Sequence, residues 1–370
     1  MIINSKLDET AIDSIIQEYK KDNTPWFIGY SGGKDSSALL KIVYNALLKI
    51  ELFHKPVTVV YCDTGVENPI VTSYVYGVFE ELKQETISHG LPLKFVIAIP
   101  NINDRYFVKV IGRGYPPPTN IFRWCTDKLR IKPIKSIIDN DDGATILLGI
   151  RGGESEQRDR TISKHTTNSV FYLKQNNSKS TLIFSPIIKH DLEDVWNALS
   201  HFDLPKSIDH KKIRDIYKDA ESECPVYRDT KGQPCGSNRF GCWTCTVVRK
   251  DKSILSLIEN GYSELKELYD FRNWLVEFRD DKKYRCDVRR NGQLGLGPIT
   301  LEGRRIIFDK LLKIQKMSKF SLISEEEIIK IKELWINDLN NDKYVEKLRP
   351  TTAKYPQAGV FSFVDRKLVV

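Results

Sequence analysis

The sequence lacks any long hydrophobic run, because no stretch approaches the roughly 18 consecutive apolar residues of a membrane-spanning helix. Its first residues, MIINSKLDET, lack the basic and then apolar pattern of a secretory signal. Cysteine is also scarce: there are seven in 370 residues, and an odd number without such a signal argues against a disulfide framework. The sequence contains neither an internal repeat nor a low-complexity run. These absences predict a soluble cytoplasmic protein with no membrane contact.

Charge is distributed unevenly along the chain, which at 370 residues is longer than one typical domain. Residues 1–205 contain 24 Lys and Arg and 24 Asp and Glu, so they carry no net charge. Residues 206–370 contain 33 and 25, and the whole formal charge of +8 lies there. A basic half suits a polyanionic partner such as DNA. Solvated helix faces with an excess of lysine would produce the same imbalance.

A glycine-rich turn lies between a predicted strand and a predicted helix. The octet Tyr30-Ser31-Gly32-Gly33-Lys34-Asp35-Ser36-Ser37 follows the apolar run Trp26–Tyr30. An amphipathic segment comes next, with apolar residues on one helical face: Leu39, Leu40, Val43 and Leu47. Two adjacent glycines let the backbone approach a ligand closely, and a helix N-terminus directs N–H groups and a positive dipole end toward it. The order of elements predicts a phosphate-binding loop.

The side chains of this turn support the same interpretation. Ser31, Ser36 and Ser37 can donate hydroxyl hydrogen bonds, and Asp35 can hold a metal ion or orient the loop. The turn does not fit the Walker pattern, which needs four residues between its glycines. It resembles instead the PP-loop, Ser-Gly-Gly-x-Asp-Ser, of ATP pyrophosphatases, which implies binding of ATP with Mg²⁺ by residues 31–37. An ordinary serine-capped turn is the alternative.

Alternating patterns over the first 200 residues predict an α/β fold. Four further apolar runs suit buried strands, at 56–61, 93–99, 144–150 and 182–188. Helical patterns separate them, at 70–87, 131–138 and 192–199. Strands that alternate with helices predict a doubly wound, mostly parallel sheet. We expect a surface loop at 172–181, and ligand binding beyond the carboxyl ends of the strands.

The distinctive segments all follow predicted strands. They are Cys62-Asp63-Thr64-Gly65, the loop from Arg123-Trp124-Cys125 to Lys132-Pro133, and the block Gly149-Ile150-Arg151-Gly152-Gly153-Glu154-Ser155-Glu156-Gln157-Arg158. With the PP-loop, they resemble the phosphoadenosine phosphosulfate (PAPS) reductase family over roughly residues 20–200. The resemblance implies the fold of the adenine nucleotide α-hydrolases and a nucleotide site that includes Gly149.

Four side chains of these segments are candidates for that site. Arg151 and Arg158 are planar, bidentate donors for phosphate or sulfate oxygens, and Glu154 could orient them or bind a metal. A surface ion-pair cluster is the alternative. Asp63 could share Mg²⁺ with Asp35 or contact the nucleotide, or it could simply form the turn before Thr64.

Cys125 is the candidate sulfur-carrying residue. It lies in sequence between Arg123 and the cations Lys128 and Arg130, which predict a lowered pKa and a reactive thiolate. As a persulfide it would deliver sulfur to an activated group. The alternative is a small buried residue beside Trp124.

Four other cysteines predict a metal centre. Cys224, Cys235, Cys242 and Cys245 lie within 22 residues, and zinc and iron–sulfur centres both accept four thiolates. The spacing resembles the DndC group of DNA phosphorothioation sulfurtransferases, as do segments 285–292 and 297–305. That resemblance implies a 4Fe–4S cluster, a DNA substrate, a cysteine desulfurase as sulfur donor and further subunits of a phosphorothioation system used in defence.

We therefore expect a PP-loop domain at 1–205, an iron–sulfur segment at 206–250 and a basic helical region at 251–370. Helical patterns cover 254–278 and 301–339. Basic patches that suit DNA phosphates lie at Lys282-Lys283-Tyr284-Arg285, Arg289-Arg290, Arg304-Arg305 and Lys310–Lys319. The chain end lacks the Glu-Cys-Gly-Leu-His type segment of PAPS reductases, which weighs against sulfonucleotide reduction. The alternatives are such a reductase, a tRNA thiolase, and a nucleotide-sensing DNA-binding subunit without catalysis.

Overall fold

The computed structural model describes most of the chain, namely residues 6–138, 143–153, 156–165, 172–174, 181–220 and 240–340. It divides into two compact units, each built from separate stretches of sequence. The first unit comprises Met1–Cys62, Pro69–Ala98 and Ile134–Phe240, and the second comprises Asp63–Asn68, Ile99–Pro133 and Gly241–Val370. The chain therefore passes back and forth between the units, whereas the domain ranges expected from the sequence were consecutive.

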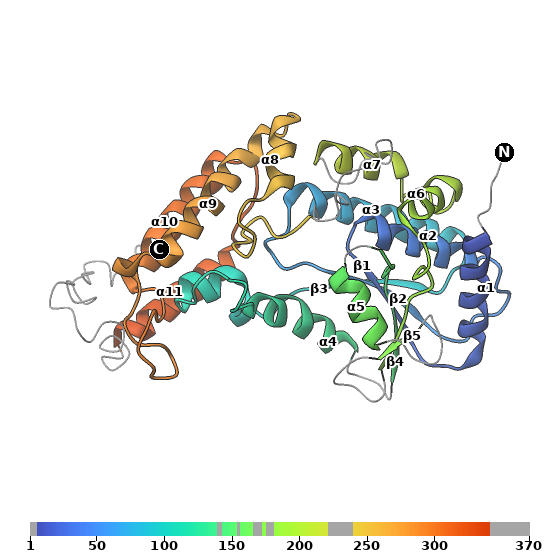
Figure 1. Cartoon of the computed structure of the whole chain (residues 1–370), viewed down its shortest axis with the longest axis horizontal. Helices are drawn as coiled ribbons and strands as arrows, with labels where there is room; N and C mark the ends of the chain where they lie inside the picture. The colour runs from blue at the N-terminus through green and yellow to red at the C-terminus, as the bar shows by residue number, and fades with distance from the viewer. Residues whose placement is uncertain are drawn as a thin grey trace. The chain divides into compact units, whose positions relative to one another are not determined.

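The first unit contains a six-stranded sheet with the order β3-β2-β1-β4-β6-β5. The strands are β1 (Trp26–Tyr30), β2 (Val57–Cys62), β3 (Leu93–Ala98), β4 (Ala144–Leu147), β5 (Tyr172–Lys174) and β6 (Thr181–Phe184) (Figure 1). All neighbours pair in parallel except β5, which is antiparallel to β6. The predicted mostly parallel sheet is confirmed. The expectation of a loop is wrong at Tyr172–Lys174, because these residues add an edge strand.

Helices cover both faces of this sheet, as the alternation of strand side chains requires. Trp26 and Ile28 of β1 join a large core with residues of α1 (Lys6–Lys21), α2 (Lys34–Leu47), α3 (Pro69–Ser88), α6 (Leu192–His201) and α7 (His210–Asp219). Phe27, between them in sequence, points to the opposite face. There it packs in a smaller cluster with Ile138 of α4 (Lys132–Ile138). The doubly wound arrangement is therefore confirmed.

The strand order reverses beside β1. The chain runs outward from β1 to β2 and β3 on one side, and β4 pairs with the other side of β1, with Ile28 opposite Leu147. In open α/β sheets a ligand site forms at such a switch point, beyond the carboxyl ends of the two strands. The octet follows β1 and the Gly149–Arg151 turn follows β4, so both lie at this position.

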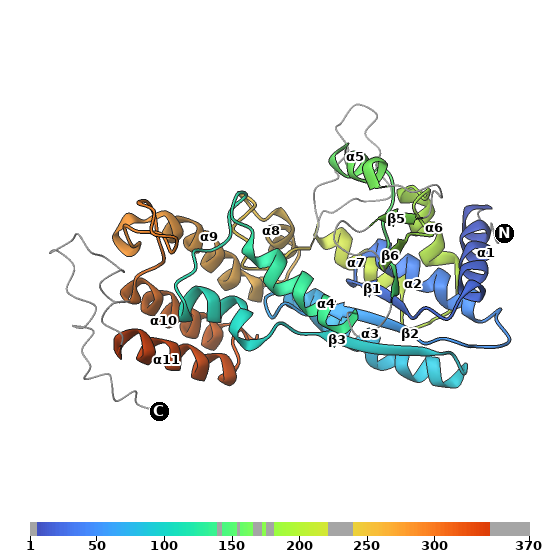
Figure 2. The same ribbon diagram turned by 90° about the horizontal axis from the view of Figure 1, so that it is seen from below.

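The second unit is largely helical. Its long helices are α8 (Lys252–Glu259), α9 (Lys266–Asp280), α10 (Leu301–Met317) and α11 (Glu325–Asn340) (Figure 2). Two π-helical turns, η2 (Val108–Gly112) and η3 (Thr126–Ile131), come from the earlier segment. The expected helical C-terminal part is confirmed, although Gly261 (φ +105°) separates α8 from α9.

Buried polar contacts hold the distant segments of this unit together. Arg304 of α10 is fully enclosed and donates to the Gly112 carbonyl at 2.6 Å and to Asp338 of α11 at 2.7 Å. Trp335 Nε1 donates to the Ile111 carbonyl at 2.8 Å. Through these contacts, residues near 112 and residues beyond 300 pack together within the same compact unit. Among the described residues, no helix is long and apolar enough to cross a membrane.

Candidate functional site

The phosphate-binding loop adopts the backbone conformation that its glycines permit. Gly32 has φ +74°, and a Cβ there would lie 2.4 Å from Val75 Cγ2, so only glycine fits. Gly33 is the N-cap of α2 and has no side-chain cap hydrogen bond. The first turn of α2 therefore directs its N–H groups and its positive dipole end at this position.

The three serines of the loop have different roles. Ser36 Oγ donates to the Gly33 carbonyl at 2.9 Å and accepts from the Ser31 N–H at 3.2 Å, which closes the loop on itself. Ser31 is exposed, with its Oγ 3.1 Å from Ser36 Oγ. Ser37 is fully buried, and its Oγ contacts the Tyr30 hydroxyl at 3.4 Å. Ser31 is therefore the hydroxyl best placed to reach a ligand, and the position of Ser37 suits packing between strand and helix.

Asp35 and Arg151 form an ion pair across the switch point. Arg151 Nε lies 2.7 Å from Asp35 Oδ1, and Lys34 Nζ lies 3.5 Å from Asp35 Oδ2. The Arg151 side chain is only 4% exposed, so the pair is sheltered from water. Both carboxylate oxygens of Asp35 thus face cations. This geometry fits the expected role of orienting the loop rather than that of a metal ligand.

Gly149 brings the end of β4 directly against the loop. A Cβ at Gly149 would lie 2.7 Å from the Asp35 carbonyl oxygen and 3.0 Å from the Ser36 nitrogen. Real Cβ atoms do not approach backbone that closely, so any other residue would displace one of the two segments. The glycine is thus required by the close approach of two backbones, and it fixes the position of Arg151 relative to the loop.

Tyr217 of α7 is a loop neighbour that the sequence analysis missed. Its hydroxyl accepts from the Lys34 N–H at 3.2 Å, and Lys34 Nζ lies 5.0 Å from its ring centroid. The only sequence signal is the four-residue spacing of Ile213 and Tyr217 on an amphipathic helix. That spacing predicts burial, and it does not reveal the contact with a loop 183 residues away.

Three further candidates are only partly described. Glu154 lies outside the described residues, and Arg158 belongs to α5 (Glu156–His165), where its side chain is not described. Asp63 belongs to the second unit and accepts a hydrogen bond from the Gly65 N–H at 2.8 Å. The turn-forming role of Asp63 is thus observed, and its role toward nucleotide or Mg²⁺ stays a prediction.

Two of the four predicted metal ligands lie in a short turn of the second unit. The Cys245 N–H donates to the Cys242 carbonyl at 2.9 Å, which is the compact turn that a Cys-x-x-Cys pair needs. Cys242 pairs with Glu67 in an isolated β-bridge, and the Trp243 N–H donates to the Val66 carbonyl at 2.9 Å. The segment after β2 therefore holds the cysteine turn in place.

The Cys242 thiol lies in a polar enclosure. Its sulfur is 3.7 Å from Thr64 Oγ1, 3.9 Å from Glu67 Oε1 and 3.9 Å from Arg130 Nη2. Arg130 and Glu67 form an ion pair at 2.9 Å. Burial, followed by the Glu67 carboxylate, raises the pKa of Cys242. A buried thiol in such a position is suited to a bound cation, which would favour the thiolate.

Cys125 lies in the same neighbourhood, but its expected activation is wrong. Burial raises the pKa of Cys125, and the thiol of Cys245 is close enough to add to the effect. The cations that flank Cys125 in sequence are directed elsewhere: Arg123 donates to Asn120, Lys128 pairs with Asp127 and Arg130 pairs with Glu67. The cations that flank Cys125 in the sequence therefore do not lower the pKa of its thiol.

Three of the described thiols, those of Cys125, Cys242 and Cys245, lie near one tyrosine. Tyr106 is buried, donates to the Thr244 carbonyl at 3.4 Å and has its pKa raised by burial and then by Cys125, Cys245 and Cys242. Cys224 and Cys235 lie outside the described residues. In the part of the chain that is described, no three His, Cys, Asp or Glu side chains are arranged to hold a metal ion. The soft thiol donors of Cys242 and Cys245 fit either a zinc or an iron–sulfur centre, and the cluster and its full ligand set stay predictions.

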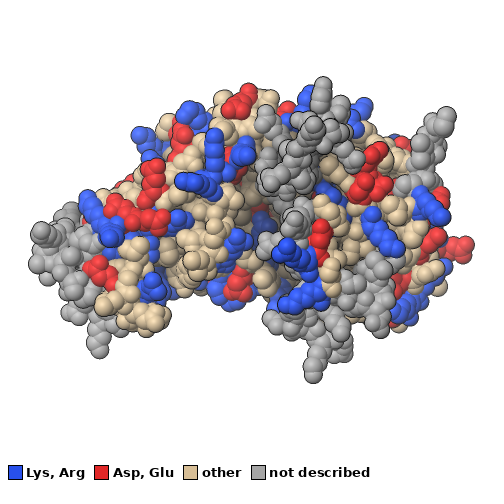
Figure 3. All heavy atoms as spheres, in the orientation of Figure 1, with Lys and Arg blue, Asp and Glu red and all other residues tan. Residues whose placement is uncertain are grey.

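Two of the expected DNA-contacting arginines are in fact internal. Arg285 is 5% exposed and donates to the Gly297 carbonyl at 2.7 Å and to the Arg279 carbonyl at 2.6 Å. Arg304 is the enclosed residue that joins α10 and α11. On the face drawn in Figure 3, lysine and arginine side chains are interspersed with aspartate and glutamate. Positive charge in the sequence therefore overstates the positive surface.

Comparison with known proteins finds a curated relative and several solved structures. A Methanocaldococcus jannaschii protein described as uncharacterized is 27% identical over 275 residues, which are 74% of this chain and 46% of that protein. The chain thus spans about half the length of this curated relative. The solved U34-tRNA thiolase NcsA of Methanococcus maripaludis, with its [4Fe-4S] cluster, is 15% identical, with a TM-score of 0.37 over 74% of this chain and 79% of that one. The PAPS reductase of Candida auris is 10% identical, with a TM-score of 0.33 over 55% and 83%.

A match to a whole family is more decisive than these single proteins. The family model of the phosphoadenosine phosphosulfate reductase domain matches residues 25–248, which begin at the first strand and end just after the cysteine turn. This range is more than half of the chain and contains the loop, the Gly149–Arg151 turn, Cys125 and the cysteine segment. The chain therefore belongs to the PAPS reductase domain family.

Proposed function

We propose that the protein is an ATP-dependent sulfurtransferase that activates a phosphate of the DNA backbone by adenylylation and helps to replace a non-bridging oxygen with sulfur. The observation that carries the nucleotide part is the loop of the first unit. Its glycines, the N-terminus of α2 and the Asp35–Arg151 pair converge at the switch point of the sheet. The family membership supports the same chemistry.

The loop is suited to release pyrophosphate from ATP. The N–H groups at the start of α2 would bind phosphate oxygens, and Ser31 would add a hydroxyl donor. Arg151, held by Asp35, would offset charge that develops on the leaving pyrophosphate. Attack by a DNA phosphate oxygen on the α-phosphorus would then form the bond to AMP as the bond to pyrophosphate breaks. Because both carboxylate oxygens of Asp35 face cations, this residue does not fit the role of a Mg²⁺ ligand.

The second unit would supply the sulfur chemistry. Cys242 and Cys245, with Cys224 and Cys235, would hold a 4Fe–4S cluster, which when bound fixes the segment and offers a site for sulfur. Cys125 would carry a persulfide supplied by a cysteine desulfurase. Its outer sulfur would attack the activated phosphorus and displace AMP. A second thiol would then attack the Cys125 sulfur of the remaining S–S bond, which forms a disulfide with Cys125 and releases the phosphorothioate.

The choice of DNA as substrate has two supports. Segments 285–292 and 297–305 resemble the DndC group, and the formal charge of +8 lies in residues 206–370. Among the arginines of these segments, Arg289 and Arg290 are exposed, whereas Arg285 and Arg304 are buried. Partner subunits of a phosphorothioation system belong to this proposal. Cellular location in the cytoplasm follows from the same assignment.

The test is to detect both products in one reaction. Protein purified without oxygen is incubated with ATP, plasmid DNA, cysteine, a desulfurase and the partner subunits. We expect pyrophosphate that depends on DNA, and phosphorothioate-linked dinucleotides by mass spectrometry after nuclease digestion. Sulfite formed from PAPS would indicate a reductase instead, and thiolated nucleosides in tRNA would indicate a thiolase. The absence of ATP–pyrophosphate exchange with every substrate would favour a nucleotide-sensing subunit.

A further inference from the structure

Two exposed loops of the second unit meet through one aromatic side chain. The Phe122 ring stacks on Tyr115, with centroids 6.4 Å apart and planes 17° apart. The Arg290 guanidinium lies 4.9 Å from the Tyr115 ring centroid and also donates to the Arg113 carbonyl. We call Tyr115, Ile121, Phe122, Arg123 and Arg290 the aromatic–cationic surface.

The apolar side chains of these loops are unusually exposed. Ile121 is 99% exposed and Phe122 is 43% exposed. In the neighbouring loop, Leu294 forms an isolated β-bridge with Val288, and its side chain is 83% exposed. Single exposed apolar residues are common, but Ile121 and Phe122 are consecutive, and exposed apolar side chains that gather in this way mark binding surfaces.

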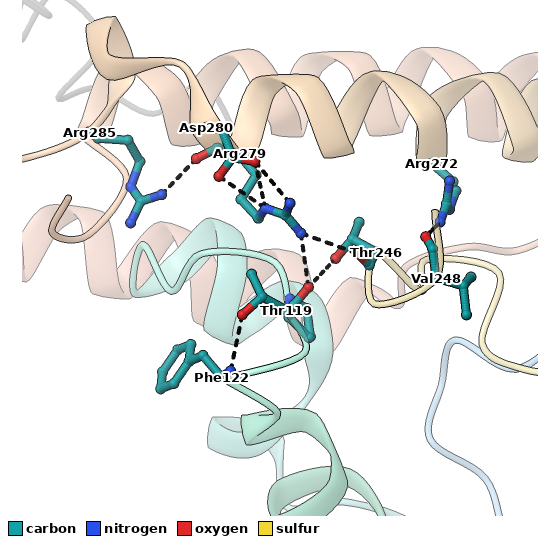
Figure 4. A network of polar contacts seen from close by, with 9 residues as sticks. Thr119, Phe122, Thr246, Val248, Arg272, Arg279, Asp280 and Arg285 are labelled. Carbon is teal, nitrogen blue, oxygen red and sulfur yellow. Dashed lines mark hydrogen bonds and ion pairs between the residues drawn. The ribbon is translucent and has the colours of Figure 1, made fainter. Parts of the chain in front are cut away.

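The exposed tip is nevertheless held firmly (Figure 4). The Phe122 N–H donates to Thr119 Oγ1 at 3.0 Å, and the Thr119 N–H donates to the Phe122 carbonyl at 3.2 Å, which closes a four-residue turn. Just before it, the Pro118 carbonyl accepts from Thr246 Oγ1 at 2.6 Å and from Arg279 Nη1 at 3.1 Å. A rigid presentation of apolar side chains lowers the entropy lost on binding.

Arg279 and Trp124 extend this support away from the tip. Arg279 also donates to the Thr246 carbonyl at 3.2 Å and pairs with Asp280 at 2.9 Å. Trp124 Nε1 donates to the Pro116 carbonyl at 3.0 Å. The turn is thus fixed on both of its flanks, and Ile121 at its apex contributes little to the fold itself.

The exposed arginines of these loops suit an anionic partner. Residues 104–127 contain four Lys and Arg and two Asp, and residues 287–302 contain two Arg, one Asp and one Glu. Acidic groups do adjoin the patch, because Lys109, which lies 5.1 Å from the Tyr115 centroid, pairs with Asp104 at 2.7 Å. Arg123 and Arg290 are exposed and lie on the loops themselves.

We propose that the aromatic–cationic surface binds unpaired nucleotides of a nucleic acid, with Phe122 stacking on a base, Ile121 wedging beside it, and Arg123 and Arg290 contacting the flanking phosphates. Aromatic side chains stack on bases of any sequence, and exposed isoleucine and phenylalanine are the residues that enter between base steps. Paired DNA presents such base faces only when it is opened. The surface would therefore select single strands or distorted duplex. This inference rests on the proposed function only in its choice of DNA over RNA.

The experiment measures fluorescence anisotropy of a labelled 20-nucleotide DNA strand, its duplex and the RNA of the same sequence, without ATP. We expect the single strand to bind more tightly than the duplex. Phe122→Ala should weaken binding of the single strand about tenfold, since a stacked base contributes about 1–3 kcal/mol. Phe122→Trp should restore it, and Ile121→Ser should weaken it about threefold. Affinity should fall with salt.

Ile87→Ser is the matched control, because Ile87 is a similarly exposed isoleucine (73%) in the first unit. Unchanged affinity of Phe122→Ala and Ile121→Ser would overturn the proposal, as would an equal loss in Ile87→Ser. Loss of binding to a partner protein with no loss toward DNA or RNA would also overturn it. The Asp35→Ala variant should bind the strand normally. Loss of nucleotide turnover, which tests the proposed function, can therefore be distinguished from loss of strand binding, which tests this surface. Tighter binding of RNA, with the same losses, would support the surface and contradict the DNA substrate.

Discussion

The two units build their chemical groups in opposite ways. In the first unit, the loop residues are consecutive in sequence, and a few contacts join them to other segments, among them the ion pair of Asp35 with Arg151. In the second unit, the environment of Cys242 is assembled from three stretches: the turn with Glu67, the turn with Arg130 and the cysteine segment itself. A contiguous site can be recognised as a motif. A site assembled from separate stretches can be recognised only when the fold is known.

This difference has a physical basis. A phosphate is bound by backbone N–H groups, whose positions depend on local φ and ψ angles and therefore on local sequence. The protonation of a thiol depends on every charge and every apolar atom within several ångströms, wherever these lie in the chain. The following predictions test whether the two units differ in this way, from the largest expected effect to the smallest.

The largest effect should follow a change in the contiguous site. Asp35→Ala removes the partner that orients Arg151 and Lys34, so we expect pyrophosphate release to fall about a thousandfold. The measurement is a coupled assay of pyrophosphate under saturating ATP. Asp22→Ala is the control, since Asp22 also pairs with a lysine, Lys55, at 3.1 Å. Equal rates in wild type and Asp35→Ala would remove the loop from the mechanism.

The second prediction concerns the assembled site. Cys125→Ser should keep pyrophosphate release and iron content while the yield of phosphorothioate falls at least about a hundredfold, because the sulfur carrier is absent. Mass spectrometry of digested DNA and an iron assay on the same sample measure both. Loss of iron equal to that of Cys245→Ser would instead make Cys125 a ligand of the centre. Normal modification would make it a packing residue.

The third prediction asks what the cysteine segment holds. Cys242→Ser or Cys245→Ser should reduce iron and acid-labile sulfide from about four to below about one per chain. The same loss is expected for Cys224→Ser and Cys235→Ser. Cys62→Ser, at the end of β2, is the control. Zinc in place of iron in the wild-type protein would contradict the cluster, and full iron in all four variants would contradict the ligand set.

The smallest effect lies in the stability of the first unit. Lys41 is buried and donates to the carbonyls of Leu199 at 3.0 Å and Phe202 at 2.7 Å. Burial lowers its pKa from 10.5 to about 8, against the opposing effect of Asp209 and other carboxylates. The unfolded chain therefore binds more protons between pH 8 and 10.5, and stability rises with pH in this window.

Urea titrations at pH 8 and pH 10 measure this effect. Relative to Lys41→Met, the wild-type protein should gain about 2 kcal/mol of unfolding free energy over that interval. Lys83→Met is a suitable comparison, because the Lys83 side chain is 43% exposed and pairs across one helical turn with Glu80. Parallel pH profiles for wild type and Lys41→Met would show that the lysine titrates normally.

The architecture of the first unit could be predicted because its signals are local. Apolar runs gave the strands, and strand–helix alternation gave the doubly wound sheet. The short antiparallel strand Tyr172–Lys174 escaped prediction, since three residues among polar ones carry too little pattern. Tyr217 escaped for another reason: its contact with the Lys34 N–H depends on how α7 packs, which no spacing reveals.

The electrostatic predictions were less reliable. Arg285 and Arg304 look like DNA-binding cations in the sequence, but the fold uses their guanidinium groups to satisfy buried carbonyls. The cations around Cys125 have carboxylate or amide partners of their own. Sequence shows which charges are present, and only the fold shows which of them neutralise each other.

The interleaving of the two units has a consequence for synthesis on the ribosome. Residues 63–68 and 99–133 emerge early, but the rest of their unit begins at residue 241. At ordinary translation rates, the intervening stretch takes on the order of 10 s to make. During that interval the apolar side chains of Phe107 and Val110 have none of the later helices to cover them. We therefore expect the nascent chain to need a chaperone most while residues 134–240 are being made. A stop codon near residue 205 would leave an aggregation-prone fragment and not an independent nucleotide-binding domain.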